Sequence, residues 1–247
     1  MTSPSAFAIA RQEGDLRGSV ERVLGELGGL EGLGRSVFLK PNFTYPFPKR
    51  GVTTSRAMIV AVVEVLRDAG VRRLCLGEGE GGYNAFSMDE TFAAFSLDEL
   101  TERYGLEVVN VNRWPSTILA VEGRRGRWNV PVPGPILEEF DTFITLPVPK
   151  VHCMTRISGA VKNQWGIVQD PMRLALHVGL DEILAAVTAR LPNALALVDG
   201  TWGLTGNGPM IEGEAIELGW VAGSDDLWLC DAVLCHLMGQ PPAKVQP

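Results

Sequence analysis

The chain has 247 residues, 46% of them hydrophobic and 21% charged, which is typical of a soluble globular protein with one sizeable core. Its net charge of −7 argues against a surface built to bind nucleic acid or an anionic membrane, because both need a broad basic face. No run approaches the roughly 20 apolar residues of a membrane span, and the first residues show no signal-peptide pattern, so we expect a cytoplasmic protein.

The first third of the chain alternates predicted strands and helices. Short apolar runs predict strands at residues 5–10, 36–39 and 72–76. Apolar residues at helical spacing predict helices at 15–30 and 56–69, the second capped by Thr54 or Ser55. This order is typical of a parallel sheet with helical crossovers.

The middle of the chain contains a segment that does not fit this alternation. After a polar and aromatic segment at 83–95, we expect a helix that ends near Tyr104 and a strand at 106–111. Residues 112–135 then alternate polar and apolar side chains and are rich in Gly and Pro. That pattern predicts a β-hairpin insertion.

The last part of the chain returns to alternation. We expect strands at residues 143–146, 194–198 and 216–222. We expect helices around Ile157, Val161 and Trp165, at 179–191, and from Ser224 or Asp225 to near Gly239. The sequence therefore predicts one α/β domain over residues 1–247, doubly wound around a mostly parallel sheet, with the hairpin as a small β insertion.

Four polar turns follow predicted strands. They are 40–42 (KPN), 77–82 (GEGEGG), 150–152 (KVH), and 199–203 (DGTWG) running on to Gly206 and Gly208. The carboxyl ends of parallel strands meet at one edge of a sheet, so we expect these turns to face one another. Pro41 fixes the turn after Lys40, which favours a functional lysine over a solvated one. Two lysines and a histidine within thirteen residues of the 150–152 turn indicate an anion pocket.

The two carboxylates at the strand ends have different expected uses. The glycines of GEGEGG do not fit the dinucleotide pattern G-x-G-x-x-G, and Glu78 and Glu80 would repel a pyrophosphate. Glu78 is instead expected to face a lysine, a metal or a cationic substrate group. Asp199 ends a strand before a glycine, a frequent position for a catalytic carboxylate and equally for one that caps a turn.

The stretch from residue 150 onwards carries further candidate groups. Lys150 and His152 share one face if the chain stays extended. Ser158 and Lys162 share one face of the predicted helix, with Thr155 as its N-cap. Clustered cations lower the pKa of a lysine towards neutrality, which makes it a base or a nucleophile.

The four cysteines, Cys75, Cys153, Cys230 and Cys235, include no C-x-x-C pair. We therefore expect no zinc site or iron–sulfur cluster held by this chain alone. Three of the four lie in apolar runs, as small buried residues do. No cofactor is predicted, and a metal ion bound by His152, His177, Glu78 or Asp199 stays open.

In their order and spacing these motifs resemble the DUF362 family, which was named for having no assigned function. The resemblance covers about residues 36–239 and includes, besides the turns above, 162–166 (KNQWG), Asp225 and Asp231. It implies that the family's signature positions are Lys40, Asn42, Lys150, His152, Lys162, Asn163 and His177. Many members carry a ferredoxin-like iron–sulfur segment with clustered cysteines, and this chain has no such segment.

From these residues we expect an enzyme that acts on a small anionic metabolite, a carboxylate, phosphate or sulfate ester, by elimination or isomerisation. Proton transfer is assigned to Lys150 or His152, with Lys162 close by and Glu78 or Asp199 as the complementary acid or orienting group. The anion is expected to bind Lys40, Lys162, Asn42, Asn163 and Ser158, at an edge that His177, Gly206 and Gly208 can also reach.

Two other classes of function stay open at this point. One is a metal- or iron–sulfur-linked redox protein. The other is a non-catalytic ligand-binding or assembly protein, for which the aromatic loop 43–47 and the insertion at 114–128 would form a partner surface. Oligomerisation is open in either case.

Overall fold

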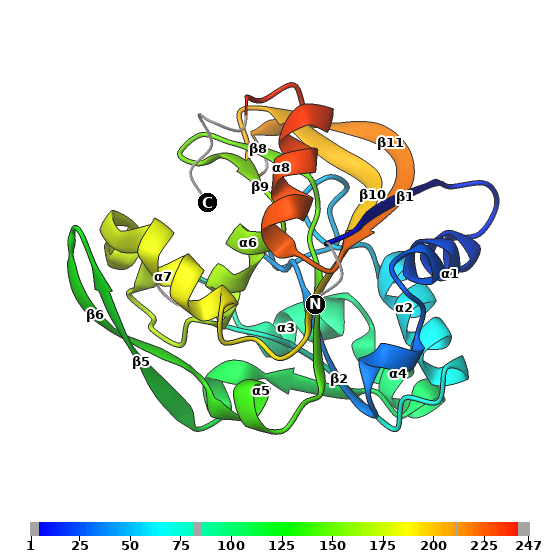
Figure 1. Cartoon of the computed structure of the whole chain (residues 1–247), viewed down its shortest axis with the longest axis horizontal. Helices are drawn as coiled ribbons and strands as arrows, with labels where there is room; N and C mark the ends of the chain where they lie inside the picture. The colour runs from blue at the N-terminus through cyan, green and yellow to red at the C-terminus, as the bar shows by residue number, and fades with distance from the viewer. Residues whose placement is uncertain (1–4, 82–84, 211, 242–247) are drawn as a thin grey trace.

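The computed structural model describes residues 5–81, 85–210 and 212–241, in which nine strands form one mixed sheet with helices on both faces (Figure 1). The main strand order is β1-β11-β10-β7-β2-β3-β4. The parallel strands are β2 (Ser36–Pro41), β3 (Arg73–Glu78), β4 (Glu107–Asn110), β7 (Thr142–Leu146) and the start of β10 (Ala194–Gly206). Antiparallel β11 (Gly213–Ser224) and β1 (Phe7–Arg11) complete one edge. The predicted α/β class with a mostly parallel sheet is confirmed.

Two β-hairpins accompany the central strands. The short hairpin of β8 (Lys150–His152) and β9 (Arg156–Ser158) joins the sheet where β8 pairs with β10. The strands β5 (Ser116–Gly123) and β6 (Gly126–Pro133) form a separate two-stranded antiparallel sheet that extends to one side of the molecule (Figure 1). The small β insertion predicted in this part of the chain is therefore confirmed as a hairpin of these two strands.

Alternate residues of the central strands enter cores on opposite faces, as the period of a strand requires. Val37 and Leu39 pack in the core beneath α1 (Leu16–Glu26) and α2 (Arg56–Asp68), whereas Phe38 packs in the core beneath α7 (Leu180–Thr188). Further helices in the described residues are α3 (Met88–Ala94), α4 (Leu97–Tyr104), α5 (Gly134–Glu138), α6 (Ala160–Asn163) and α8 (Leu227–Leu237). Short 3-10 helices are η1 (Glu31–Leu33), η3 (Val111–Arg113), η4 (Gln164–Ile167) and η5 (Arg173–Gly179).

The prediction of a helix around Ile157, Val161 and Trp165 is wrong in its first part. Ile157 lies on β9, which turns back to pair with β8, and only Ala160–Asn163 are α-helical. Thr155 is not a helix cap, because its hydroxyl donates to the carbonyl oxygen of Ile157 inside the hairpin. Cross-strand pairing therefore overrides the helical spacing of the apolar residues.

Two further boundaries differ from the sequence prediction. The turn expected at 199–203 is part of β10, because β11 pairs with β10 as far as Gly206 around one register shift between Gly200 and Trp202. The cap of α8 is Asp226, whose carboxylate accepts from the backbone N–H groups of Trp228 and Leu229. Asp225 instead accepts from the backbone N–H of Ala6.

The polar and aromatic segment at 83–95 contains α3, which Ser87 caps by accepting from the N–H of Asp89. Gly82, the last residue of the GEGEGG run, and residues 83–84 lie outside the described residues. Across the described ranges, every helix is too short or too polar to span a bilayer.

Candidate functional site

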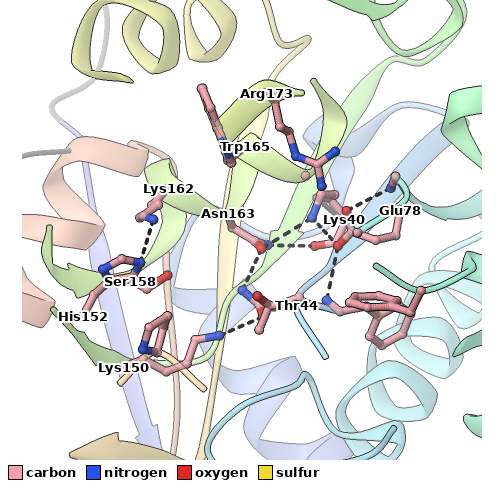
Figure 2. A pocket seen from close by; sticks show the side chains of 17 residues that line it. Lys40, Thr44, Glu78, Lys150, His152, Ser158, Lys162, Asn163, Trp165 and Arg173 are labelled. Carbon is pink, nitrogen blue, oxygen red and sulfur yellow. Dashed lines mark hydrogen bonds and ion pairs between the residues drawn. The ribbon is translucent and has the colours of Figure 1, made fainter. Parts of the chain in front are cut away.

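Polar side chains from the ends of β2 and β3, from the β8–β9 hairpin and from α6 meet at a cavity of about 140 Å³ (Figure 2). The parallel register of β2 and β3 brings their carboxyl ends together, as the sequence predicted. The cavity is lined by Lys40, Asn42, Phe43, Thr44, Glu78, Gly79, Gly81, Phe86, Lys150, His152, Ser158, Lys162, Asn163, Trp165, Gly166, Arg173 and Pro209.

Lys40 and Glu78 form a buried ion pair in the cavity wall, with 2.6 Å between Nζ and Oε2. Burial lowers the pKa of Lys40, and the Glu78 carboxylate opposes that effect. The Lys40 ammonium also donates to the Pro41 carbonyl oxygen at 2.7 Å and to Asn163 Oδ1 at 3.4 Å. Its three N–H bonds therefore all have acceptors within the protein, so Lys40 stabilises the wall and has no N–H left for a substrate.

Gly166 allows η4 to pack directly on this ion pair. A Cβ atom built at Gly166 would lie 2.2 Å from Glu78 Oε1 and 2.9 Å from Lys40 Nζ. A side chain at this position would therefore separate the segment that carries Trp165 from the ends of β2 and β3.

Two asparagines connect the ion pair to Lys150. Asn42 Nδ2 donates to Asn163 Oδ1 at 2.9 Å, and Asn163 Nδ2 donates to Thr145 Oγ1 at 2.8 Å. Asn42 Oδ1 accepts from Lys150 Nζ at 2.8 Å. Because both amides are buried and hydrogen-bonded on both sides, they fix the positions of Lys40 and Lys150 relative to each other.

Lys150 is 1% exposed and donates to Asn42 Oδ1 and to the Val52 carbonyl oxygen, both at 2.8 Å. Burial, and next the charges of Lys162 and Lys40, lower the pKa of Lys150 to about 7. A neutral amine has two N–H bonds and one lone pair. Since the two carbonyl oxygens accept both N–H bonds, the lone pair of neutral Lys150 is left without a protein donor among the described residues.

His152 and Lys162 form a second pair, with 2.8 Å between Nε2 and Nζ. His152 Nδ1 accepts from the backbone N–H groups of Met154 and Thr155, which assigns the ring proton to Nε2. An Nε2–H group can donate only to a neutral Lys162, because a charged lysine has no lone pair to accept the hydrogen bond. Burial lowers the pKa of Lys162 to about 8 and, with nearby cations, the pKa of His152 to about 3. In this hydrogen bond Lys162 is the neutral amine, the form that predominates above its pKa of about 8, and its two N–H bonds are available to the cavity.

The short helix α6 is positioned by a buried carboxylate on α8. Asp231 accepts from the backbone N–H groups of Ala160 at 2.5 Å and Val161 at 3.0 Å. Burial raises the pKa of Asp231 to about 7, and these two N–H groups oppose the rise. Gly159 makes the contact possible, because a Cβ atom there would lie 2.2 Å from Asp231 Oδ1. Asp231 thus holds the helix that carries Lys162 and Asn163.

Two N–H donors at the cavity have no hydrogen-bond partner in the described residues: Arg173 Nη1 and Trp165 Nε1. Both side chains are more than nine-tenths buried, at 6% and 8% exposed, and burial lowers the pKa of Arg173. The sequence pattern did not identify Arg173, and it assigned Trp165 to an apolar helix face. The nearest sequence signal was an arginine beside an apolar residue shortly after Pro171. That pattern does not distinguish a buried arginine from one on the surface.

The structure brings together most of the predicted site residues and places four elsewhere. Ser158, opposite Lys150 in the β8–β9 register, lines the cavity with Asn42, Glu78 and Asn163. The four that do not line it are Asp199, His177, Gly206 and Gly208.

Asp199 is buried at the N-terminus of α2. Its carboxylate accepts from the backbone N–H of Ser55 at 2.7 Å and from Thr201, so of its two expected uses these contacts match the capping carboxylate, and Asp199 does not line the cavity. β10 continues as a strand past Asp199 instead of turning towards the lysines. His177 packs edge-on against the Trp165 ring, behind the cavity wall, with 5.0 Å between ring centroids.

The proposed metal ligands His152, His177, Glu78 and Asp199 do not converge. Glu78 is paired with Lys40, and both nitrogens of His152 have protein partners. Over the described ranges no three His, Cys, Asp or Glu side chains gather with the geometry of a metal site. Cys75, Cys230 and Cys235 are buried, as expected, and Cys153 is exposed.

Comparison with known proteins gives a family and two relatives. A protein-family model described as "Domain of unknown function (DUF362)" matches residues 37–236. Thylakoid-associated protein sll1697 of Synechocystis sp. is 26% identical over 251 residues, which cover 95% of this chain and 73% of the relative. A crystal structure of a Thermotoga maritima protein aligns with a TM-score of 0.57 and 12% identity over 93% of this chain. This chain spans 60% of the length of that protein, and the likeness concerns the fold alone.

Proposed function

The chain belongs to the DUF362 family, and because that family has no known function we propose one from the cavity: an enzyme that removes a proton from a small anionic metabolite. The observation that carries this proposal is the meeting, in one small cavity, of two buried N–H donors without partners in the described residues and a buried lysine that donates to two carbonyl oxygens. Arg173 Nη1 and Trp165 Nε1 are the donors, and Lys150 is the lysine.

The charges around the cavity favour an anion. Glu78 is paired with Lys40, whereas Arg173 makes no salt bridge within the described part of the chain. A carboxylate, phosphate or sulfate group would accept hydrogen bonds from Arg173 and Trp165 and balance the arginine charge. The cavity volume of about 140 Å³ lies below the ~300–1,000 Å³ of sites for drug-sized ligands, which favours a small metabolite.

The roles of the two lysines follow from their hydrogen bonds. Lys150 is the general base, because its lone pair has no protein donor and its pKa of about 7 suits proton transfer near neutral pH. Lys162 directs its two remaining N–H bonds at the negative charge that develops on the substrate. His152 keeps Lys162 neutral and in place. Elimination and isomerisation both begin with this proton removal.

The proposal is tested by hydrogen exchange, which does not require the product to be known. Purified protein is incubated in D₂O with a set of short carboxylic, hydroxy and oxo acids, and loss of C–H signal is followed by NMR. We expect exchange catalysed by the wild type and reduced at least about 100-fold in Lys150→Met, as for the loss of a general base. The matched control is Lys49→Met, which removes an exposed lysine and should leave the rate unchanged.

A binding protein without catalysis is the second candidate, since unpartnered donors also suit a ligand that is only held. Saturable anion binding with no exchange for any acid in the set would support it over the enzyme. In the aromatic surface expected for an assembly protein, Phe47 is exposed, whereas Phe43 is buried and Trp114 packs against Phe38.

A further inference from the structure

The cavity combines an anion-binding side with an amine side. Figure 2 shows the Arg173 and Trp165 side chains across the cavity from Lys150, with Asn163 between them. A ligand that contacts both sides must carry an anionic group and, a short distance along the molecule, a group that reacts with an amine. The small volume of the cavity limits such a ligand to a short chain.

A base with the basicity of Lys150 is too weak to remove a proton from a carbon next to a plain carboxylate. The electron pair left on that carbon needs a group that can accept it. Lys150 provides one if it first bonds to the substrate, because the positively charged nitrogen of a protonated imine accepts the electron pair. Desolvated lysines held in a fixed position are the ones that proteins use for this chemistry.

We propose that Lys150 forms an imine with a short-chain oxo acid whose carboxylate is bound by Arg173 Nη1 and Trp165 Nε1. This inference rests on the proposed function and names its substrate class, because the anion side and the lysine are the same. It changes the role of Lys150 from the proton acceptor to the residue bonded to the substrate.

The bond changes balance without an oxidant or reductant. The Lys150 lone pair attacks the carbonyl carbon and forms the C–N bond. The carbonyl oxygen takes one proton of the amine and a second proton from the solvent and leaves as water. This completes the C=N bond of a protonated imine, which keeps the other amine proton on its nitrogen. Asn42 Oδ1 and the Val52 carbonyl oxygen, which accept both amine protons in the free protein, orient the lone pair before the attack.

The experiment is reductive trapping on the full chain. Wild-type protein is incubated with pyruvate and sodium cyanoborohydride, digested, and mapped by mass spectrometry. We expect the reduced adduct on the peptide that contains Lys150 and, under the same conditions, far less on the exposed Lys49. Acetone, which has the carbonyl but no carboxylate, should label Lys150 at least about tenfold less, as expected for losing a hydrogen bond to a charged group.

Two variants test the carboxylate contact and the site of the adduct separately. Arg173→Met should lower pyruvate labelling of Lys150 by about tenfold or more and leave acetone labelling unchanged. Lys150→Gln should abolish the labelling of that peptide without moving it to Lys162. The position of the adduct is decided by the peptide map of the wild-type protein. The proposal can therefore be rejected even if a variant folds poorly.

The possible results distinguish the two proposals. Deuterium exchange that depends on Lys150, with no adduct on Lys150 from pyruvate or from longer oxo acids such as acetoacetate, would overturn the imine and leave the general base standing. Equal labelling by pyruvate and acetone would also overturn it, because Arg173 and Trp165 would then play no part. Absence of both exchange and anion binding would reject the proposed function itself.

Discussion

Lys150 and Lys162 reach the cavity as neutral amines for different reasons. Lys150 is neutral because it is buried and because two carbonyl oxygens accept only its two N–H bonds. Lys162 is neutral because His152, with Nδ1 occupied by backbone donors, has only a proton to offer it. At the scale of single residues, backbone carbonyl and N–H groups therefore decide the protonation state of the side chains in this cavity.

The lowered pKa of Lys150 predicts how its removal affects stability at different pH values. The folded pKa of about 7 lies below the ordinary value of 10.5, so the folded protein binds fewer protons than the unfolded chain between those values. The cost of burying Lys150 is therefore largest below pH 7 and declines as the pH rises towards 10.5. The quantity compared is the free energy of unfolding of Lys150→Met minus that of the wild type. This difference should be about 3 kcal/mol higher at pH 6 than at pH 9.

Urea denaturation at the two pH values measures this difference. The Lys49→Met variant is the control, because Lys49 is exposed and its removal should shift the free energy of unfolding equally at both. Any loss of the hydrogen bonds to Asn42 and Val52 applies at both pH values and cancels in the comparison. A Lys150→Met effect that is the same at pH 6 and pH 9 would show that Lys150 stays charged when buried.

At the scale of the elements, the site depends on one short helix that cannot be stable alone. The helix α6 spans only Ala160–Asn163, yet it carries Lys162 and Asn163. Its N-terminus is held by Asp231, a residue 71 positions further along the chain on α8. Cross-strand pairing in the β8–β9 hairpin fixes the residues immediately before it.

This dependence gives a matched pair of substitutions on α8. Asp231→Ala should destabilise the protein by about 1–3 kcal/mol and also lower the exchange rate, because two buried N–H groups lose their acceptor and α6 moves. Asp226→Ala removes the N-cap of the same helix and should cost a similar ~1 kcal/mol without affecting exchange. Denaturation curves and the NMR exchange assay provide the two measurements. Equal losses of activity in both variants would mean that Asp231 acts through stability alone.

The elements that follow local rules were predictable from the sequence, and those fixed by distant pairing were not. The sequence predicted α2 with Thr54 or Ser55 as its cap, of which Ser55 is the cap, and it predicted the β5–β6 hairpin, since caps, turns and periodicity are local signals. It failed for Ile157 and for Asp199, because β8 and β11 hold those segments as strands. Arg173 could not be recognised, since only the tertiary structure shows that it is buried and that its Nη1 has no hydrogen-bond partner among the described residues.

At the scale of the whole molecule, a chain with a net charge of −7 brings three lysines and one arginine to a single cavity. The parallel order of β7, β2 and β3 brings Lys40 and Glu78 to one edge of the sheet, and the hairpin after β7 adds Lys150 there. The sequence predicted this meeting from the direction of parallel strands alone. The sequence left open whether Glu78 would face a lysine, a metal or a cationic substrate group. The structure pairs Glu78 with Lys40, whereas Arg173 makes no salt bridge within the described residues.

This charge distribution predicts which arginine controls anion binding. Sulfate and short carboxylates should raise the melting temperature of the wild type by mass action, with a stabilisation of about 2.7 kcal/mol when the ligand is at 100 times its dissociation constant. Arg173→Met should remove this stabilisation, whereas Arg190→Met, which removes an exposed arginine, should keep it. Both variants lower the net charge of the protein by the same amount, so general attraction between the anion and the protein is matched. A thermal-shift titration in which the two variants respond equally to the anions would place anion binding outside the cavity, and Arg173 and Trp165 would lose their assigned role.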